Sequence, residues 1–193
     1  FKKFKPRLIL YCDNGSMSGI SEAAYKMNII RIDFQHSLIS YINALYHYPK
    51  KALPKTKATN PEYIFTFGTF WHKNIKTVSK KIPIGFPYLE YEKKKLNIVD
   101  LEKRDKSILI ISMLTGNAKA VLVKTAIELA DKLPEWKIYY KLRSNEYQNW
   151  QEDYPKNFKK ENIIVISGNS PTLYELFSKC RVQISTNSTA VYE

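Results

Sequence analysis

The stretch Ser107-Ile-Leu-Ile-Ile-Ser112 decides the fold class of this chain of 193 residues. Its nearly unbroken apolar run is typical of a strand that is buried on both faces of a parallel sheet. The turn Thr115-Gly116-Asn117 follows, and Ala118–Leu133 then repeats apolar residues at helical spacing on one face. A buried strand that leads through a short turn into a helix is the repeating unit of α/β proteins.

The same alternation of strand and helix continues on both sides of this unit. Strands are predicted at Arg7–Cys12, Ile29–Phe34, Tyr63–Phe67, Ile82–Gly85, Trp136–Leu142, Asn162–Ile166 and Val182–Ser185. Helices are predicted at Ile20–Met27, from Phe70, at Asn145–Trp150 and at Leu173–Lys179. The last of these has Ser170 as N-cap and Pro171 at its first position. A long loop is predicted at Ser40–Lys57. Strand–helix repetition with short connections predicts parallel sheets that are covered on both faces.

A charged stretch, Glu90–Lys106, follows Phe86-Pro87-Tyr88 and predicts a linker between two such units. We therefore expect an α/β protein with two Rossmann-like parallel-sheet domains, at residues 1–89 and 90–193. The sequence begins with Phe1 and ends inside an apparent helix. We expect it to be a fragment of a larger protein, with the second domain truncated at its C-terminus.

The composition limits the classes of partner. Lys and Arg number 31 against 18 Asp and Glu, a net charge of +13, but the lysines lie in small scattered groups without an RNA-binding aromatic motif or zinc-finger spacing. We rank a lysine-rich surface first, attraction to an anionic membrane or anionic substrates second, and nucleic acid last. No apolar run approaches the roughly 20 residues that cross a bilayer. Cys12 and Cys180 lack metal-ligand spacing, which predicts buried free thiols and fits a cytoplasmic protein.

Polar residues follow most of the predicted strands. In open α/β sheets the ligand lies beyond the carboxyl ends of the strands, and a cleft forms where two such edges face each other. The residues at these ends are Asp13–Ser16, Gln35–Ser37, Gly68, Ser112–Asn117, Arg143–Ser144, Ser167–Ser170 and Ser185–Thr189.

The last of these turns is the strongest candidate for a phosphate site. Ser188 and Thr189 lie between a strand and an apparent helix, where hydroxyls and free backbone N–H groups suit a phosphate, although a plain loop with an N-cap is the alternative. Ser112, Thr115 and Gly116 form a second strand-to-helix turn, which is either a phosphate contact or only a turn. Arg143 suits a bidentate contact to a phosphate.

His36 is the candidate catalytic residue, because it follows a strand at the sheet edge among polar neighbours. A general base, a donor to a phosphate and a structural histidine are the alternatives. His47 and His72 lie among aromatic residues, so packing or a surface position is preferred, and no metal site is expected. Asp13 is interpreted as a turn residue rather than an acceptor-side carboxylate. Tyr41, Tyr46 and Tyr48 either line an acceptor groove or pack a loop over the core.

The order of motifs resembles that of a known family. The motifs are Ala23-Ala24 before Ile29–Phe34, Gln35-His36-Ser37, Pro61–Gly68, Trp71, Ile84–Leu89, Tyr140-Lys141-Leu142 and Ser188–Glu193. Together they resemble the bacterial polysaccharide glycosyltransferases of the GT-B type, the capsule and lipopolysaccharide enzymes with their sialyltransferase-like and Kdo-transferase-like relatives. The resemblance covers most of the chain, although each motif is short.

The resemblance implies an enzyme that transfers a sugar, without an essential metal ion or separate cofactor, from a nucleotide sugar to a surface polysaccharide or glycolipid. By this resemblance residues 1–89 are the C-terminal part of the N-terminal, acceptor-side domain. Residues 90–193 would bind a CMP-, UDP- or GDP-linked donor, with Glu193 on the ribose. Alternatively, Glu193 only complements the helix dipole. The implied location is the cytoplasm, with peripheral association at the anionic inner membrane face and no nucleic-acid partner.

Two motifs depart from the family pattern. Relatives often carry Gln-His-Gly where this chain has Gln35-His36-Ser37, and many CMP-sugar enzymes carry His-Pro where it has Arg143-Ser144. The second departure bears on the use of CMP-sugars and keeps a catalytically degenerate binding module open. A sugar-nucleotide epimerase and a polyol-phosphate transferase are the enzyme alternatives on the same fold.

Overall fold

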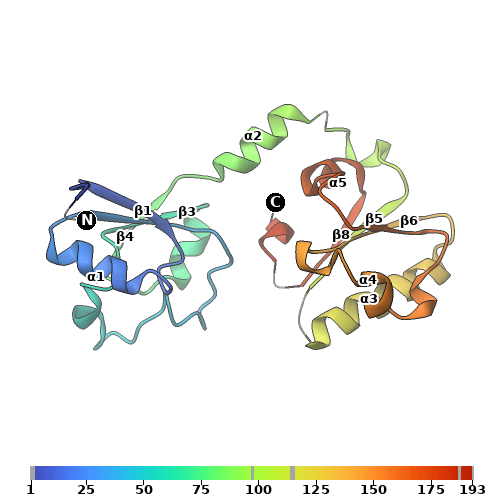
Figure 1. Ribbon diagram of the computed structural model, residues 1–193. Helices are drawn as coiled ribbons and strands as arrows, with labels where there is room; N and C mark the ends of the chain where they lie inside the picture. Colours follow the sequence, from blue (N-terminus) through green and yellow to red (C-terminus); the bar gives the residue numbers. More distant parts are fainter. Residues whose placement is uncertain (1–2, 97, 114–115, 187, 193) are drawn as a thin grey trace. The chain divides into compact units, whose positions relative to one another are not determined.

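A computed structural model shows an α/β chain with two four-stranded sheets, in which all strand pairs are parallel (Figure 1). The structure describes residues 3–96, 98–113, 116–186 and 188–192. The chain divides into two compact units, unit 1 (Phe1–Tyr88) and unit 2 (Leu89–Glu193), with one sheet each. Within the described residues, no helix is long and apolar enough to cross a membrane. The predicted α/β class with parallel sheets is therefore confirmed.

Unit 1 has the strand order β1-β2-β3-β4, so each strand lies beside the strand that precedes it in the sequence. The strands are β1 (Leu8–Cys12), β2 (Ile30–Phe34), β3 (Tyr63–Thr66) and β4 (Lys80–Pro83), and the connections hold α1 (Ser18–Lys26) and the 3-10 helices η1 (Leu53–Thr56) and η2 (Thr69–Asn74). Its core packs Ile64 of β3 against Trp71 and Ile75, with Ile39 and Tyr46 from the long loop. All of these apolar residues therefore lie on one face of the sheet.

The opposite face of the unit 1 sheet is open, which differs from the expectation of cover on both faces. Leu8, Leu10 and Ile30 project from it with 43 %, 55 % and 48 % of their surface exposed. Crossovers between parallel strands are right-handed, so a sheet whose strands follow one another in a single direction has all its connections on the same side. The strand order of unit 1 thus explains the open face.

Unit 2 has the strand order β7-β6-β5-β8 and is covered on both faces (Figure 1). The strands are β5 (Ser107–Ile111), β6 (Lys137–Lys141), β7 (Ile163–Ile166) and β8 (Val182–Ile184). The helices are α2 (Pro87–Lys95), α3 (Gly116–Lys132), α4 (Trp150–Asp153) and α5 (Leu173–Lys179), with 3-10 helices η3 (Leu101–Lys103), η4 (Ser144–Glu146), η5 (Lys156–Phe158) and η6 (Thr189–Tyr192). The order reverses at β5, because β6 and β7 lie on one side of it and β8 on the other.

The reversal at β5 places helices on opposite faces of the sheet. Ile108 and Ile110 of β5 pack with α3 residues such as Leu122, whereas Leu109 and Ile111 pack with Leu176 of α5. Every residue of β5 is buried, as its apolar run predicts.

The stretch expected as a linker contains the helix α2, whose polar sequence lacks an apolar stripe. Other local predictions are wrong. The helix predicted at Asn145–Trp150 is not formed, because the 3-10 turn η4 ends at Glu146 and α4 begins only at Trp150. The N-cap of α5 is Thr172 rather than Ser170: its hydroxyl accepts a hydrogen bond from the amide of Glu175, and the Glu175 carboxylate accepts one from the amide of Thr172, a capping box. Cys180 is buried but Cys12 is exposed, because Cys12 lies on the open face of the unit 1 sheet; both thiols are free.

Candidate functional site

The carboxyl edge of the unit 2 sheet holds the candidate site. Ligands of open α/β sheets bind beyond the carboxyl ends of the strands where the strand order reverses. In this unit the reversal lies between β5 and β8, so Ser112 after β5 and Ser185 and Thr186 after β8 flank that point. Lys141 ends the neighbouring strand β6.

The hydroxyls of Ser185 and Thr186 are unpartnered donors at this edge. Both hydroxyl oxygens are buried and have no hydrogen-bond partner within the part of the chain that the structure describes. Ile111 of β5 pairs with Lys141 of β6, and Ile110 pairs with Ile184 of β8. Ser185, the residue after Ile184, therefore lies on the other side of Ile111 from Lys141. Two strand spacings, about 10 Å, separate the two backbones. Because an unsatisfied buried hydroxyl is costly, these two groups call for an acceptor such as a phosphate oxygen.

Lys141 is a candidate residue of this edge that the sequence analysis did not single out. It is only 9 % exposed, and its ammonium group donates to the carbonyl oxygens of Gly168 and, at 3.3 Å, of Pro171. It forms no ion pair with a carboxylate of the described residues, and burial lowers the pKa of its amine. Buried charges are normally paired, so this ammonium favours an anionic ligand. The available signal was a lysine at the end of an otherwise apolar strand.

Arg143 adds a second cation at the same end of β6. Its backbone amide donates to Oε2 of Glu146 at 3.0 Å and begins η4. Its side chain is exposed, with one guanidinium nitrogen 3.6 Å from the sulfur of Met113. The guanidinium therefore remains accessible, and its contact to a phosphate stays a prediction.

Ser112 belongs to a buried polar network. Its hydroxyl lies 3.1 Å from the hydroxyl of Tyr154, which donates to Oε1 of Glu146 at 2.7 Å. The ammonium of Lys119 lies 3.5 Å from the same carboxylate and 4.3 Å from the Tyr154 ring centre. Burial opposes ionisation of Glu146, but hydrogen bonds from the Arg143 amide and from hydroxyls outweigh it and hold the pKa of that carboxyl below its usual value. Ser112 is thus engaged within unit 2, and its contact to a phosphate stays a prediction.

The remaining residues that were predicted to bind the nucleotide of the donor sugar lie at two turns. Gly116 begins α3 with a φ of +53°, and Thr115 lies outside the described residues. The hydroxyl of Ser188 accepts a hydrogen bond of 3.3 Å from the amide of Ala190, and Thr189 begins η6, a single 3-10 turn in place of the expected helix. Ser188 therefore caps η6, and Glu193 also lies outside the described residues.

His36 lies at the carboxyl edge of the sheet in unit 1, where Gln35 anchors its turn. The amide of Gln35 donates to the carbonyl oxygen of Phe65 at 2.9 Å, and its side chain bonds the backbone of Phe67 at 2.9 Å and of Ser37 at 3.0 Å. The His36 side chain is exposed. A fixed turn thus presents an accessible imidazole, as a general base requires.

Other unit 1 candidates have structural roles. Asp13 adopts a φ of +64° and accepts two hydrogen bonds from the Ser16 hydroxyl, at 3.0 and 3.1 Å, so it is a turn residue. Tyr46 is buried and bonds Asp33, which packs the long loop over the core, whereas Tyr41 is exposed. Nε2 of His72 lies 2.9 Å from the Thr66 hydroxyl, and burial lowers the pKa of this imidazole.

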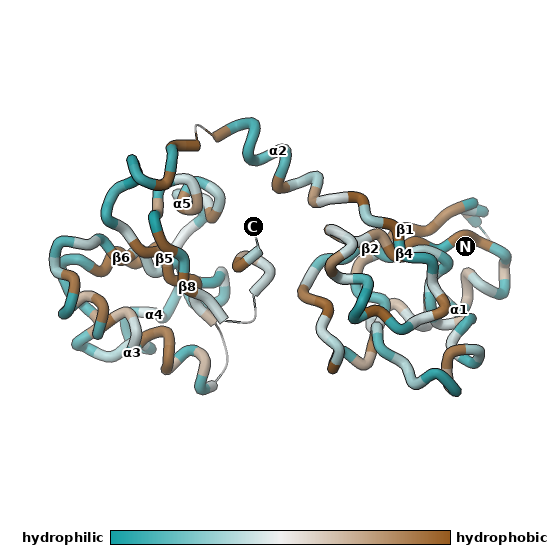
Figure 2. The backbone as a smooth tube through the Cα atoms, turned by 180° about the vertical axis from the view of Figure 1, so that it is seen from behind, coloured by the Kyte–Doolittle hydropathy of each residue, from teal (hydrophilic) through white to brown (hydrophobic). Residues whose placement is uncertain are grey.

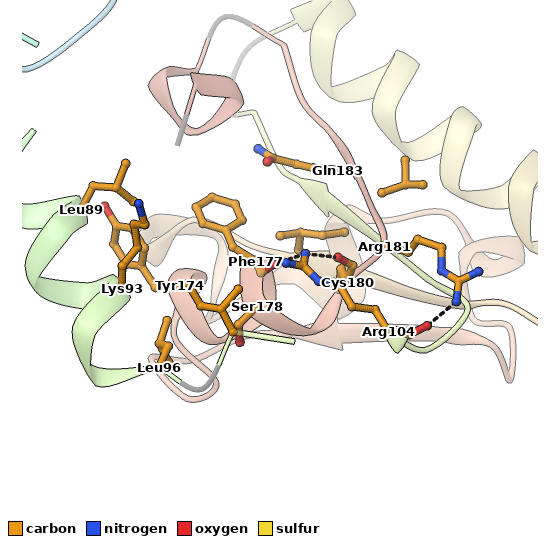
Figure 3. A pocket seen from close by; sticks show the side chains of 13 residues that line it. Leu89, Lys93, Leu96, Arg104, Tyr174, Phe177, Ser178, Cys180, Arg181 and Gln183 are labelled. Atoms are coloured by element: carbon orange, nitrogen blue, oxygen red, sulfur yellow. Dashed lines mark hydrogen bonds between the residues drawn. The ribbon is translucent and has the colours of Figure 1, made fainter. Parts of the chain in front are cut away.

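A separate cavity of about 280 Å³ lies on the α5 side of unit 2 (Figure 3). Leu89 and Lys93 of α2 and Tyr174 and Phe177 of α5 line it. Arg104 donates to the carbonyl oxygens of Phe177, at 2.8 Å, and of Cys180, at 2.9 Å, and so caps the end of α5. Because Arg104 precedes β5, this cavity lies toward the amino ends of the strands, away from the candidate site.

Comparison with known proteins identifies no family for this chain. No protein-family model matches the chain, and no curated protein matches it significantly. Within the described ranges, no group of three or more His, Cys, Asp or Glu residues lies close enough together to hold a metal ion. The structure is that of an α/β protein with two parallel-sheet units; at the carboxyl edge of unit 2, within the described residues, it places a buried lysine without a carboxylate and two unpartnered hydroxyls.

Proposed function

We propose that this protein is a glycosyltransferase that transfers a sugar from a nucleotide sugar to a glycan or glycolipid acceptor. The observation that carries the proposal is a row of groups at the carboxyl edge of unit 2: the buried Lys141 ammonium, which donates to two carbonyl oxygens but has no carboxylate partner among the described residues, and the unpartnered hydroxyls of Ser185 and Thr186. A nucleoside phosphate supplies the negative charge and the acceptor oxygens that this row lacks.

The chemistry follows from charge development. As the bond between the sugar and the phosphate oxygen of the donor breaks, negative charge grows on the departing phosphate. A fixed ammonium and guanidinium stabilise this charge without a metal ion. Lys141 and Arg143 provide these two cations. The acceptor hydroxyl loses its proton late, and His36 on unit 1 is the base that accepts it. A two-domain GT-B arrangement, a longer parent protein and a peripheral position at an anionic membrane belong to the same proposal.

A catalytically degenerate nucleotide-binding module is the second candidate. It is favoured by Arg143-Ser144, because the Arg143 backbone caps η4 and no imidazole follows β6 at this point. Such a module would bind a nucleotide at Lys141 without turning over a sugar nucleotide.

Calorimetric titration with CMP, CDP, UDP and GDP tests the donor site, with an RNA oligomer as control. A bound nucleotide also raises stability, by about 2.7 kcal/mol at 100 times Kd. We expect one nucleotide to bind, Lys141→Met to weaken it roughly tenfold or more, and Lys137→Met, an exposed position on the same strand, to leave the Kd unchanged. Absence of binding by all four nucleotides, or an unchanged Kd in the Lys141 variant, overturns the proposal. His36→Ala separates the candidates: lost turnover with an unchanged Kd supports the transferase.

A further inference from the structure

The open face of the unit 1 sheet is apolar, whereas the covered face buries charged and polar side chains together with the core. Arg31 and Asp33 of β2 and Thr66 of β3 point to the covered face and are almost inaccessible. The other face, which we call the bare face, carries the exposed Leu8, Leu10 and Ile30 and the half-buried Ile32, Phe34 and Phe65. Phe86, Pro87 and Tyr88 border it beside Phe34 and Phe65. Figure 2 shows the hydrophobic colour along β1. Contiguous exposed apolar patches of this kind mark interaction sites.

The bare face is one continuous surface across the strands. Leu8 pairs with Ile30, Leu10 with Ile32 and Phe34 with Phe65, so their side chains form neighbouring rows. The rings of Phe34 and Phe65 meet edge to face at 5.1 Å. Residues from three strands thus present a single apolar surface rather than isolated exposed side chains.

Unit 2 shows how a parallel sheet is normally completed. Its reversed strand order brings α5 onto the second face, whereas the single direction of unit 1 leaves the second face without a helix. Purely parallel sheets occur almost only with both faces covered, and helices provide that cover. The bare face therefore has the chemistry and the topology of a face that receives helices.

The dimensions and charge define the occupant. Four strands span about 15 Å and five residues of a strand about 16 Å, which fits one or two helices of roughly 11 residues. Residues 1–88 contain 14 Lys and Arg against 4 Asp and Glu, so unit 1 carries ten of the thirteen net positive charges. A second copy would bring two strongly basic units together, whereas an acidic partner complements them.

We propose that the bare face is a docking surface for polypeptide helices that are apolar toward the sheet and acidic along their flanks. This inference stands apart from the proposed transferase activity, because it uses no residue of the donor edge. A helix on the bare face would remove Leu10 and Ile30 from water and place its carboxylates near the basic rim, which includes Arg7 before β1 and Lys80 of β4.

The test uses the whole chain and two probe peptides of about 14 residues, each locked as a helix with leucines on one side. One peptide carries glutamates on its flanks and the other lysines. We expect the acidic peptide to bind roughly tenfold more tightly in fluorescence anisotropy, and Leu10→Ser and Ile30→Ser each to weaken it severalfold. Val121→Ser on α3, a position that is also 55 % exposed, is the matched control and should leave binding unchanged.

Three results overturn the proposal. The first is failure of the acidic peptide to bind, or binding equal to that of the basic peptide. The second is a dimer in sedimentation equilibrium that Leu10→Ser dissociates, which assigns the face to a second copy. The third is flotation with anionic vesicles that Leu10→Ser abolishes, which assigns it to lipid. Protection of β1 and β2 amides from hydrogen exchange by the acidic peptide, at an unchanged melting temperature of each variant, supports the proposal without relying on one substitution.

Discussion

The hydroxyl of Tyr46 donates a 2.7 Å hydrogen bond to Oδ2 of Asp33, a carboxyl group that is completely buried on the covered face of the unit 1 sheet. The pKa of the Asp33 carboxyl is raised to about 7, chiefly by burial and also by the charge of Asp13, which together outweigh the hydrogen bonds from Tyr46 and the Asn14 backbone. Oδ1 has no partner among the described residues. Asp33 therefore holds a proton well above the pH at which an exposed aspartate loses it.

This pair predicts a pH-dependent stability. The Asp33 pKa is about 7 in the folded state and about 3.9 in the unfolded chain, so the folded state binds the extra proton. The contribution of Asp33 to the free energy of unfolding is therefore greatest below about pH 4 and is lost as the pH rises through about 7. The total loss is about 4 kcal/mol. Asp33→Asn should remove this loss, so the variant gains stability relative to the natural chain between pH 5 and pH 8 in urea unfolding. The exposed Asp105→Asn should show no such gain, and parallel profiles for all three proteins would contradict the assignment.

The ion pair of the buried Arg31 with Glu62, whose side chain is 39 % exposed, predicts a loss of stability when it is broken. Arg31 is 1 % exposed; its guanidinium binds both carboxylate oxygens of Glu62 and the carbonyl oxygen of Ser21. Burial disfavours ionised Glu62, but its hydrogen bonds with Arg31 outweigh this and lower the pKa of the carboxyl. Glu62→Ala leaves the Arg31 charge without a carboxylate but with its carbonyl acceptors, and because Glu62 is partly exposed the cost should be about 1–3 kcal/mol in denaturant unfolding.

The matched control for Glu62 is Glu22, which pairs with Lys26 at 2.8 Å on the surface of α1. Exposed pairs are screened by solvent and contribute little, so Glu22→Ala should be nearly neutral apart from helix propensity. Equal losses for the two variants would show that Arg31 finds other partners when Glu62 is removed.

Two buried tyrosines of unit 2 predict opposite effects of the same change. Tyr154→Phe removes the hydrogen bonds to Glu146 and Ser112 and should cost about 1–3 kcal/mol. The hydroxyl of Tyr140 is buried and has no hydrogen-bond partner within the described residues, so Tyr140→Phe should be neutral or stabilising. Thermal unfolding of the two variants checks this, and an equal loss in both would mean that the Tyr154 network is not the source of the stability.

Two glycines predict effects of opposite sign on helix stability. Gly116 has a φ of +53°, which strains any residue with a Cβ, so Gly116→Ala should cost about 1–2 kcal/mol although the space around it is open. Gly19 lies inside α1 with open space, and Gly19→Ala should stabilise by about 0.5–1 kcal/mol. Hydrogen exchange in β2 and β5 reports each unit separately; a stabilised Gly116 variant would contradict the left-handed conformation at that residue.

Periodic patterns of apolar residues in the sequence predicted most of the strands and helices. The strand at β5 and the helix at α5 were predicted within a residue of their observed bounds, since their apolar spacing repeats strongly. The helix α2 was missed because Glu90–Lys95 is charged on all sides, and β4 begins two residues earlier than predicted because Lys80 and Lys81 hide a strand. Local polarity thus concealed elements whose pairing is set by distant residues.

The candidate site was also predicted in part from the sequence and decided in part by the tertiary structure. The sequence alone determined the α/β class and the alternation of strands and helices, and it indicated which polar residues end the strands, because these depend on local periodicity and turn chemistry. Only the tertiary structure decided that Ser112 is engaged by Tyr154, that Lys141 lacks a carboxylate, and that one face of the unit 1 sheet is uncovered. Partners of a buried charge and the faces of a sheet are fixed by strand order, which joins residues far apart in the chain and leaves no periodic trace in it.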